Sequence, residues 1–228
     1  MTAQVDHLVV AASTLQEGVA WCERTLGITP GPGGEHPLMG THNRLFNISS
    51  VQYPHAYFEI IAIDTGAACA RIQGENRWFD LENEALQLKL KLNGPQLIHF
   101  VANTPQAAPA IQALADLGID RGELLAASRM TSNGLLSWRI TVRADGQRLM
   151  NGTLPTLIEW GDVHPTQHMA PSGVTLHSLT ASQPNSDELR AAYTAINLQG
   201  VGVAQGSANL IATLQTPHGL VTLESKGT

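Results

Sequence analysis

Three segments of the chain open with the same pattern of apolar and polar positions. Each begins with a β-rich run that carries one histidine near its middle, at 5–11, 97–102 and 174–180. Short runs rich in branched and apolar residues are typical of strands. A pattern that returns at intervals of this size predicts related structural units within one chain.

Each predicted strand is followed by apolar residues at helical spacing, as in the series Leu15, Val19, Cys22 and Leu26, which Gly27 ends. Similar spacing predicts helices within 107–117 and 189–196. Further β-type runs follow each helix, at 43–48 and 57–63, at 123–129, 136–142 and 156–160, and at 200–204, 209–215 and 219–224. The order is therefore βαβββ three times, although the Gly- and Pro-rich stretch 29–40 resembles a long loop.

This order predicts an α+β fold of repeated βαβββ units, with curled, half-open mixed sheets and helices on the outer face. We expect residues 1–166 to form a paired domain. Residues 167–228 would then add a third unit that either extends the same sheet or pairs with a second chain. An unpaired curled sheet exposes apolar surface, so the odd number of units favours a homodimer.

Composition narrows the class of protein. Of the 228 residues, 43% are hydrophobic and 14% are charged, which is enough apolar material for a core. Thirteen basic and 19 acidic residues give a net charge of −6 without a basic block, so nucleic acid and anionic membranes are not expected partners. The start of the chain lacks the pattern of a signal peptide, and no stretch is apolar enough to span a bilayer. We therefore expect a cytoplasmic protein with two reduced cysteines.

The chemistry that stands out is a histidine in the first strand and a glutamate in the last strand of each unit. The pairs are His7 with Glu59, His99 with Glu159, and His177 with Glu224. A carboxylate within the run Phe-Glu-Ile-Ile costs several kcal/mol to bury unpaired. Such a group needs a metal, a cation, a hydrogen-bond donor or a wet cavity beside it.

Two adjacent units can bring the first two pairs to one concave face. His7, Glu59, His99 and Glu159 would form a mixed N/O ligand set suited to Zn, Ni, Fe, Mn or Co, with positions left open for substrate. The alternative is that the histidines are hydrogen-bonded core residues and the glutamates lie on solvated edges. His177 and Glu224, flanked by polar residues, fit that alternative better.

Several motifs resemble one known family. They are GGEHPLMGTHN at 33–43, YFEII at 57–61, RWF at 77–79, and LIEW at 157–160 followed by His164-Pro165. Together with the βαβββ repeats, they resemble the glyoxalase-like domain proteins of the vicinal oxygen chelate superfamily, which includes glyoxalase I and the extradiol dioxygenases. The resemblance covers about 4–166. It implies the metal ligands His7, Glu59, His99 and Glu159, without implying a particular substrate.

Further residues are candidates for roles around this centre. Glu59 or Glu159 can act as a base, and His36 or His42 as an acid/base group. Asn43 supplies hydrogen bonds unless it only caps the next strand. Arg44 or Arg139 can hold an anionic substrate group unless each is an ordinary surface charge, and Trp138 can line the cleft. His164 and His168 lie in a proline-bounded linker, where we expect solvent exposure.

Three functions remain open from the sequence. The first is a metal-dependent lyase, isomerase or dioxygenase that acts on a small oxygenated substrate. The second is a metal-free protein that binds or sequesters a small molecule in a cup lined by Trp138, Val9, Ile61 and Val101. The third is a structural homodimer whose cup is filled by its own side chains.

Overall fold

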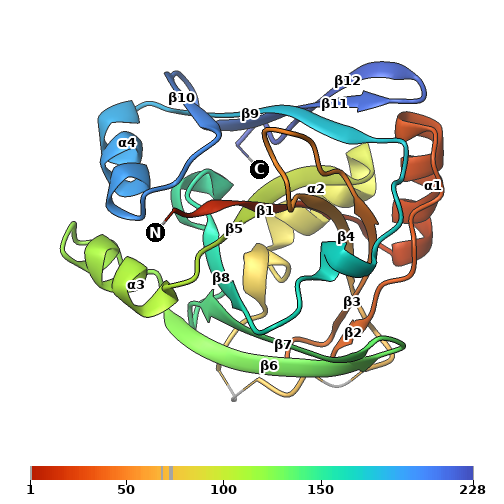
Figure 1. Cartoon of the computed structure of the whole chain (residues 1–228), viewed down its shortest axis with the longest axis horizontal. Helices are drawn as coiled ribbons and strands as arrows, with labels where there is room; N and C mark the ends of the chain where they lie inside the picture. The colour runs from red at the N-terminus through yellow and green to blue at the C-terminus, as the bar shows by residue number, and fades with distance from the viewer. Residues whose placement is uncertain (1, 68, 72–73, 228) are drawn as a thin grey trace.

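A curled sheet of eight strands forms the centre of the molecule (Figure 1). The computed structural model describes residues 2–67, 69–71 and 74–227. The strands lie in the order β2-β3-β4-β1-β5-β8-β7-β6. Their bounds are β1 Gln4–Ala11, β2 Glu35–His36, β3 Thr41–Asn47, β4 Tyr57–Ile63, β5 Gln96–Asn103, β6 Glu123–Thr131, β7 Gly134–Val142 and β8 Thr156–Trp160.

Two βαβββ units build this sheet. In each unit the first strand pairs in parallel with the last, β1 with β4 and β5 with β8. An antiparallel pairing of β1 with β5 joins the units at the middle of the sheet. The predicted α+β class and curled mixed sheet are confirmed.

Helices follow the predicted positions closely. The helix α1 (Leu15–Leu26) begins where the Thr14 hydroxyl accepts a hydrogen bond from the Glu17 amide at 3.1 Å, and it ends at Gly27, whose φ of 75° suits glycine. In the second unit α3 spans Ala107–Ala115. A further helix, α2 (Glu84–Asn93), lies in the connection between the units.

The third segment has the same order of elements but a different strand pairing. Its elements are β9 (Thr175–Gln183), α4 (Ser186–Ala195), β10 (Val201–Gln205), β11 (Asn209–Thr216) and β12 (Gly219–Glu224), and the sheet order is β10-β9-β11-β12. Here the first strand pairs in parallel with the second and antiparallel with the third, which leaves the last strand at an edge. Of the two alternatives for this unit, extension of the large sheet is therefore wrong, because its strands form a separate sheet.

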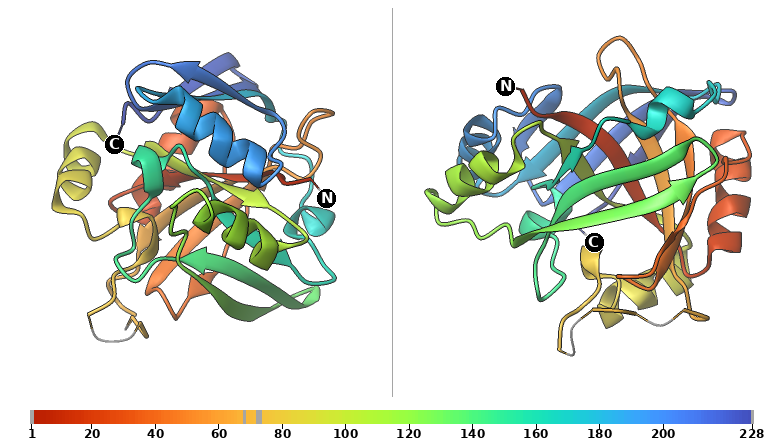
Figure 2. Two further views of the ribbon diagram at one scale, coloured as in Figure 1. Left: turned by 90° about the vertical axis from the view of Figure 1, so that its left-hand side faces the viewer. Right: turned by 60° about the horizontal axis from the view of Figure 1, so that its bottom comes forward.

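The second sheet instead packs face to face on the outer surface of the first (Figures 1 and 2). Leu8, Phe58 and Phe100 of the large sheet share one core with Leu179 and Leu210 of the small one. This internal packing covers the apolar surface that had suggested a partner chain. The homodimer stays a prediction, without that argument to support it.

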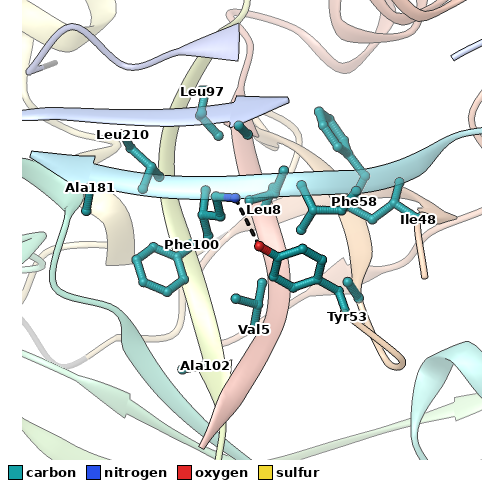
Figure 3. Packing of buried hydrophobic residues seen from close by; sticks show 14 of the residues in the cluster. Val5, Leu8, Ile48, Tyr53, Phe58, Leu97, Phe100, Ala102, Ala181 and Leu210 are labelled. Atoms are coloured by element: carbon teal, nitrogen blue, oxygen red, sulfur yellow. Dashed lines mark hydrogen bonds between the residues drawn. The ribbon is translucent and has the colours of Figure 1, made fainter. Parts of the chain in front are cut away.

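Tyr53 ties the two sheets together within this core (Figure 3). Its hydroxyl accepts a hydrogen bond from the Leu179 amide at 3.0 Å and donates one to the Gly200 carbonyl at 2.7 Å. Burial raises the pKa of Tyr53, so the hydroxyl keeps its proton and can serve both contacts.

The concave face of the large sheet carries a separate apolar cluster. Val9, Ile61, Val101, Ile140 and Ile158 belong to it, and a short 3-10 turn, η1 (Trp78–Asp80), lays two aromatic rings on it. Because the two clusters lie on opposite faces, the direction of each strand side chain decides which environment it meets. Among the described helices, none has the length and apolar character required to cross a bilayer.

Candidate active site

A β-bulge in β1 builds the centre of the site. The pairing of β1 with β5 shifts between Val5 and His7, which leaves Asp6 as the extra residue. Strict alternation would send neighbouring side chains to opposite faces, but here the Asp6 carboxylate reaches the His7 ring, with Oδ1 2.6 Å from Nδ1. Both residues are buried.

Asp6 accepts hydrogen bonds from three side chains. Besides His7, the Trp160 indole N–H donates to Oδ2 at 2.8 Å and His164 Nε2–H donates to the same oxygen at 3.0 Å. Burial alone would raise the pKa of Asp6, but the bonds from His164 and His7 outweigh it and hold that pKa below its usual range. Asp6 is therefore a fixed negative charge that orients the His7 ring.

The other nitrogen of His7 faces Glu59. His7 Nε2 lies 3.6 Å from Glu59 Oε2, and Asn43 Nδ2 donates to Glu59 Oε1 at 2.6 Å. Glu59 is only 5% exposed, so these contacts are what make its burial tolerable. The structure therefore brings His7 and Glu59 together in one hollow.

His36 supports this arrangement from behind Asn43. Asn43 Nδ2 lies 3.3 Å from His36 Nε2, and Asn43 Oδ1 accepts the Gly34 amide at 2.8 Å, while His36 Nδ1 pairs with the Thr41 hydroxyl at 3.0 Å. Burial first, then the positive charge of Arg129, lowers the pKa of His36 to about 3. His36 lines the cavity, but its neutral ring has both nitrogens engaged, so it positions Asn43 and is not a free acid or base.

A cavity of about 40 Å³ lies against these residues. Its polar wall is formed by His7, His36, Asn43, Tyr57, Glu59 and Arg129. The remaining wall is largely apolar and includes Trp78, Phe79, Trp138, Ile140, Ile158 and Trp160. Asn43, Arg129 and Leu136 also line a groove of about 900 Å³ that opens outward, so the inner cavity adjoins a larger entrance.

The second unit does not repeat this site. His99 is fully buried, and its two ring nitrogens are both engaged: Nδ1–H donates to the Gly152 carbonyl at 2.8 Å, and Nε2 accepts the Thr156 amide at 3.1 Å. Burial, together with the charge of Arg121, holds the pKa of His99 well below its ordinary value. Neither nitrogen is free to bind a metal in this arrangement.

Glu159 lies on the opposite face of the sheet from Glu59. Its neighbours Ile158 and Trp160 point into the cup, so the alternation of β8 directs Glu159 outward. There its Oε2 accepts the Ala107 amide at the start of α3 at 2.9 Å, and its Oε1 pairs with Arg139. Burial acts against ionisation of Glu159, yet the Ala107 N–H and Arg139 outweigh it, so its pKa is lowered.

The four predicted ligands therefore do not converge on one ion. Within the residues that the structure describes, no three His, Cys, Asp or Glu side chains form a group that could hold a metal. His7 and Glu59 remain adjacent, but His99 and Glu159 are occupied elsewhere. The four predicted residues therefore do not fit a metal centre with four protein ligands.

A family comparison identifies the fold. The model of the glyoxalase-like domain family matches residues 5–196. The chain belongs to this family. The predicted membership in the vicinal oxygen chelate superfamily is thus confirmed, and the match reaches beyond the paired units into α4 of the third segment.

Comparison with solved structures gives two examples to which this glyoxalase-like protein is similar. A hypothetical protein from Staphylococcus aureus is 13% identical, with 91% of this chain and 88% of that chain covered and a TM-score of 0.57. A methylmalonyl-CoA epimerase of Streptomyces coelicolor in complex with 2-nitronate-propionyl-CoA is 16% identical over 70% of this chain and 98% of that one, at a TM-score of 0.43. The similarity to the Staphylococcus aureus protein shows a common fold only. A search of curated proteins finds no significant match.

The other predicted substrate residues of the glyoxalase-like chain fall in three places. Trp138 lines the inner cavity, as the sequence suggests. His42 and Arg44 line the outer groove, where Arg44 is exposed. Arg139 lies outside with Glu159, half exposed. In the third segment His177 is exposed and Glu224 is bound by Asn209, in agreement with the solvated-edge interpretation.

Four residues at the site are not apparent from the sequence patterns. Asp6 sits in an apolar strand next to a histidine, and a carboxylate there always needs partners, which is a usable signal. The linker composition predicts solvent exposure for His164, which is wrong, because its ring is 8% exposed beside Asp6. Trp78 belongs to the RWF motif, which assigns it no role, and nothing in the run Ala-Ser-Arg-Met distinguishes Arg129 as a cavity residue.

Proposed function

We propose that this glyoxalase-like protein is an enzyme of the isomerase or lyase type that moves a proton on a small oxygenated substrate, with Glu59 as the base. The observation that carries the proposal is the buried Glu59 carboxylate, which is held by Asn43, stands next to His7 and lines the small inner cavity. Buried acid/base groups with fixed partners inside a cavity are the usual mark of a catalytic site.

The step can be written so that every atom is accounted for. Glu59 removes a proton from a carbon beside a carbonyl group, the C–H bond breaks, and its electron pair moves to the carbonyl oxygen as an enolate. The proton is then held on the Glu59 carboxyl group. Its return to the same carbon restores the substrate and gives exchange with solvent protons. If that carbon carries a hydroxyl group, the intermediate is an enediolate, and return of the proton to the neighbouring carbon, with transfer of the hydroxyl proton to the former carbonyl oxygen, gives an isomer. Loss of a leaving group on the carbon beyond, which takes the proton from the Glu59 carboxyl group, gives a lyase reaction.

His7 would share the proton with Glu59. Its Nδ1–H is fixed on Asp6, so its Nε2 lone pair points toward the carboxyl group 3.6 Å away. A buried aspartate behind a histidine keeps the ring in one tautomer and stabilises the charged form. His7 can therefore receive the proton from Glu59 and give it back, while Asn43 holds the other carboxylate oxygen in place.

A second candidate is a metal-free protein that binds or sequesters a small molecule in the same cup. The aromatic rings of Trp78, Phe79, Trp138 and Trp160 around the cavity favour it, because such walls bind flat apolar groups without any chemistry. Binding without proton exchange would select this function. A cytoplasmic location is retained as part of either proposal.

Deuterium exchange tests the proposed reaction even when the substrate is not identified. The protein is incubated in D₂O with neutral and acidic carbonyl compounds that are small enough for the cup, and loss of C–H signal is followed by NMR. We expect exchange with at least one compound, loss of exchange in Glu59→Gln, and retention in the matched control Glu159→Gln. Exchange that survives Glu59→Gln contradicts the assignment of the base.

Metal analysis of the gently purified protein tests the cofactor prediction separately. A stoichiometric Zn, Ni, Fe, Mn or Co ion that is lost in His7→Ala but kept in His99→Ala would place the ion on the first unit alone. An ion that is lost in both variants would restore the four-ligand interpretation. A dioxygenase reaction depends on such a centre and is not included in the proposal.

A further inference from the structure

An arginine without a partner reaches into the site from the hairpin of β6 and β7. Nε and Nη1 of Arg129 are buried and make no hydrogen bond within the described residues. The guanidinium lines the cavity that also contains Glu59 and His36. Arg129 as a whole is half-buried, yet two of its donor nitrogens are buried without an acceptor, which costs free energy that the acceptor group of a bound ligand would recover.

A second donor of the same cavity is also without a partner. The indole Nε1–H of Trp78 is buried and makes no hydrogen bond to any described residue, and the Trp78 ring lines the cavity. Trp78 comes from the turn η1 and Arg129 from β6, so two unrelated segments of the chain each contribute a residue with an unpaired donor to the wall of one small space. Two unpaired donors at one cavity indicate that a bound ligand supplies the acceptor group.

The glycine-rich loop leaves room for the guanidinium. A Cβ atom on Gly34 would lie 1.6 Å from Arg129 Nη1. The φ of Gly34 is not in the left-handed region, so its backbone conformation does not require glycine. The absence of a side chain at Gly34 therefore serves the position of Arg129 and not the turn.

The surroundings favour a singly charged, planar anion. A guanidinium fork matches a carboxylate in size and geometry, with two parallel N–H···O bonds. The neighbouring Glu59 is anionic when it acts as a base and would repel a doubly charged phosphate more strongly than a carboxylate. The largely apolar walls disfavour a dianion for the same reason, since they offer few donors for its remaining oxygens.

We propose that Arg129 and Trp78 bind the carboxylate group of the substrate, so that the substrate class is a small carboxylic acid with a carbonyl near the reacting carbon. That the bound acid is a substrate rests on the proposed function, but the anion site itself does not depend on catalysis. Arg129 is the residue that selects acids over neutral carbonyl compounds, in place of Arg44 and Arg139, which the sequence suggested.

Binding is tested on the full chain through its intrinsic tryptophan fluorescence, because Trp78, Trp138 and Trp160 all line the cavity. The probes are pyruvate, its uncharged isostere pyruvamide, and inorganic phosphate. Titrations use the protein with Glu59 intact, because the discrimination against phosphate depends in part on its charge, and proton exchange on pyruvate leaves the compound unchanged. We expect saturable binding of pyruvate and at least about tenfold weaker binding of pyruvamide and of phosphate.

Two variants assign the binding to Arg129. Arg129→Gln is expected to weaken pyruvate binding by about 10- to 100-fold, whereas Arg44→Gln, a matched change in the outer groove, leaves it unchanged. Gly34→Ala is expected to weaken it by about tenfold with the fold intact, because the new methyl group displaces only the end of the Arg129 side chain. Circular dichroism of each variant checks the fold.

The outcomes separate this inference from the proposed function. Pyruvate binding that is unaffected by Arg129→Gln, or equal binding of pyruvamide, overturns the carboxylate site even if deuterium exchange occurs. Tighter binding of phosphate than of pyruvate also overturns it. Carboxylate binding that depends on Arg129, combined with no exchange on any compound, supports the site and rejects the enzyme.

Discussion

The first two units place a histidine and a glutamate at corresponding strand positions and use them differently. In the first unit the bulge at Asp6 fixes one nitrogen of His7 and leaves the other facing Glu59. In the second unit Gly152 and Thr156 engage both nitrogens of His99, and Glu159 supports a helix on the other face. A shared position in a repeat therefore does not establish a shared role, because the partners of each nitrogen and the face of each strand decide it.

The largest expected difference between the units is in catalysis. Glu59→Gln should lower kcat by about 10²- to 10⁴-fold, the usual contribution of a positioned general base. Glu159→Gln should change kcat by less than about twofold, because its carboxylate lies outside the cup. Steady-state rates on whichever compound shows exchange provide the measurement. Equal losses in the two variants would mean that both units act in the reaction.

The next largest effect is on stability, and here the larger loss is expected in the second unit. His99→Ala should lower the free energy of unfolding by about 2–4 kcal/mol, because it leaves the Gly152 carbonyl and the Thr156 amide unpaired in a fully buried place. The matched change His42→Ala, at a half-buried residue of the outer groove, should cost less than about 1 kcal/mol. Urea denaturation measures both, and a cost for His99→Ala no larger than that for His42→Ala would contradict the account.

The buried neutral histidines also predict a pH dependence. His99 and His36 have lowered pKa values in the folded protein, whereas the unfolded chain binds a proton on each below about pH 6.5. Their stabilising contribution is therefore present above that pH and is lost as the pH falls, by about 1.4 kcal/mol per pH unit for each histidine. Urea denaturation between about pH 6 and pH 5 should show this slope, and His99→Gln should remove about half of it. A slope unchanged by His99→Gln would contradict the assignment.

The smallest effect concerns the outer face of the second unit. Glu159→Gln should cost about 0.5–1 kcal/mol, because the amide oxygen still accepts the Ala107 N–H while the charge pairing with Arg139 and the start of α3 is lost. Thermal unfolding at low and high salt measures it. A loss above about 2 kcal/mol would show that Glu159 supports more of the structure than its contacts indicate.

The elements were predictable because their patterns are local. The apolar series of α1 and its glycine stop, and the alternating runs of the strands, need only neighbouring residues to be recognised. The pairing of the third segment was not predictable, since a βαβββ order is compatible with more than one sheet order. Its β9 lies beside β11 in a separate sheet, and that sheet shares a core with Phe58 and Phe100 of the large one.

Only the His7 and Glu59 part of the site, which the first unit supplies, was predictable from the sequence. His7 and Glu59 are polar residues in apolar strands, and their side chains face the cup as alternation requires. Alternation also carried the information that Glu159 faces outward, because Ile158 and Trp160 flank it, but the repeated His and Glu positions outweighed that signal. The place of Asp6 in an apolar strand signals that it needs partners, but the bulge that turns it toward His7 is not visible in the sequence. The positions of Arg129 and His164 depend on long-range packing.

The central claim is that the first unit alone presents a free imidazole nitrogen to the cup. The ¹⁵N NMR signals of the imidazole rings test it directly when one equivalent of Zn²⁺ is added near neutral pH. We predict that His99 keeps its neutral, Nδ1-protonated form and that its two nitrogen signals do not move, whether or not those of His7 respond. A shift of His99 Nε2 together with that of His7 would show that both units supply ligands, and would contradict the account.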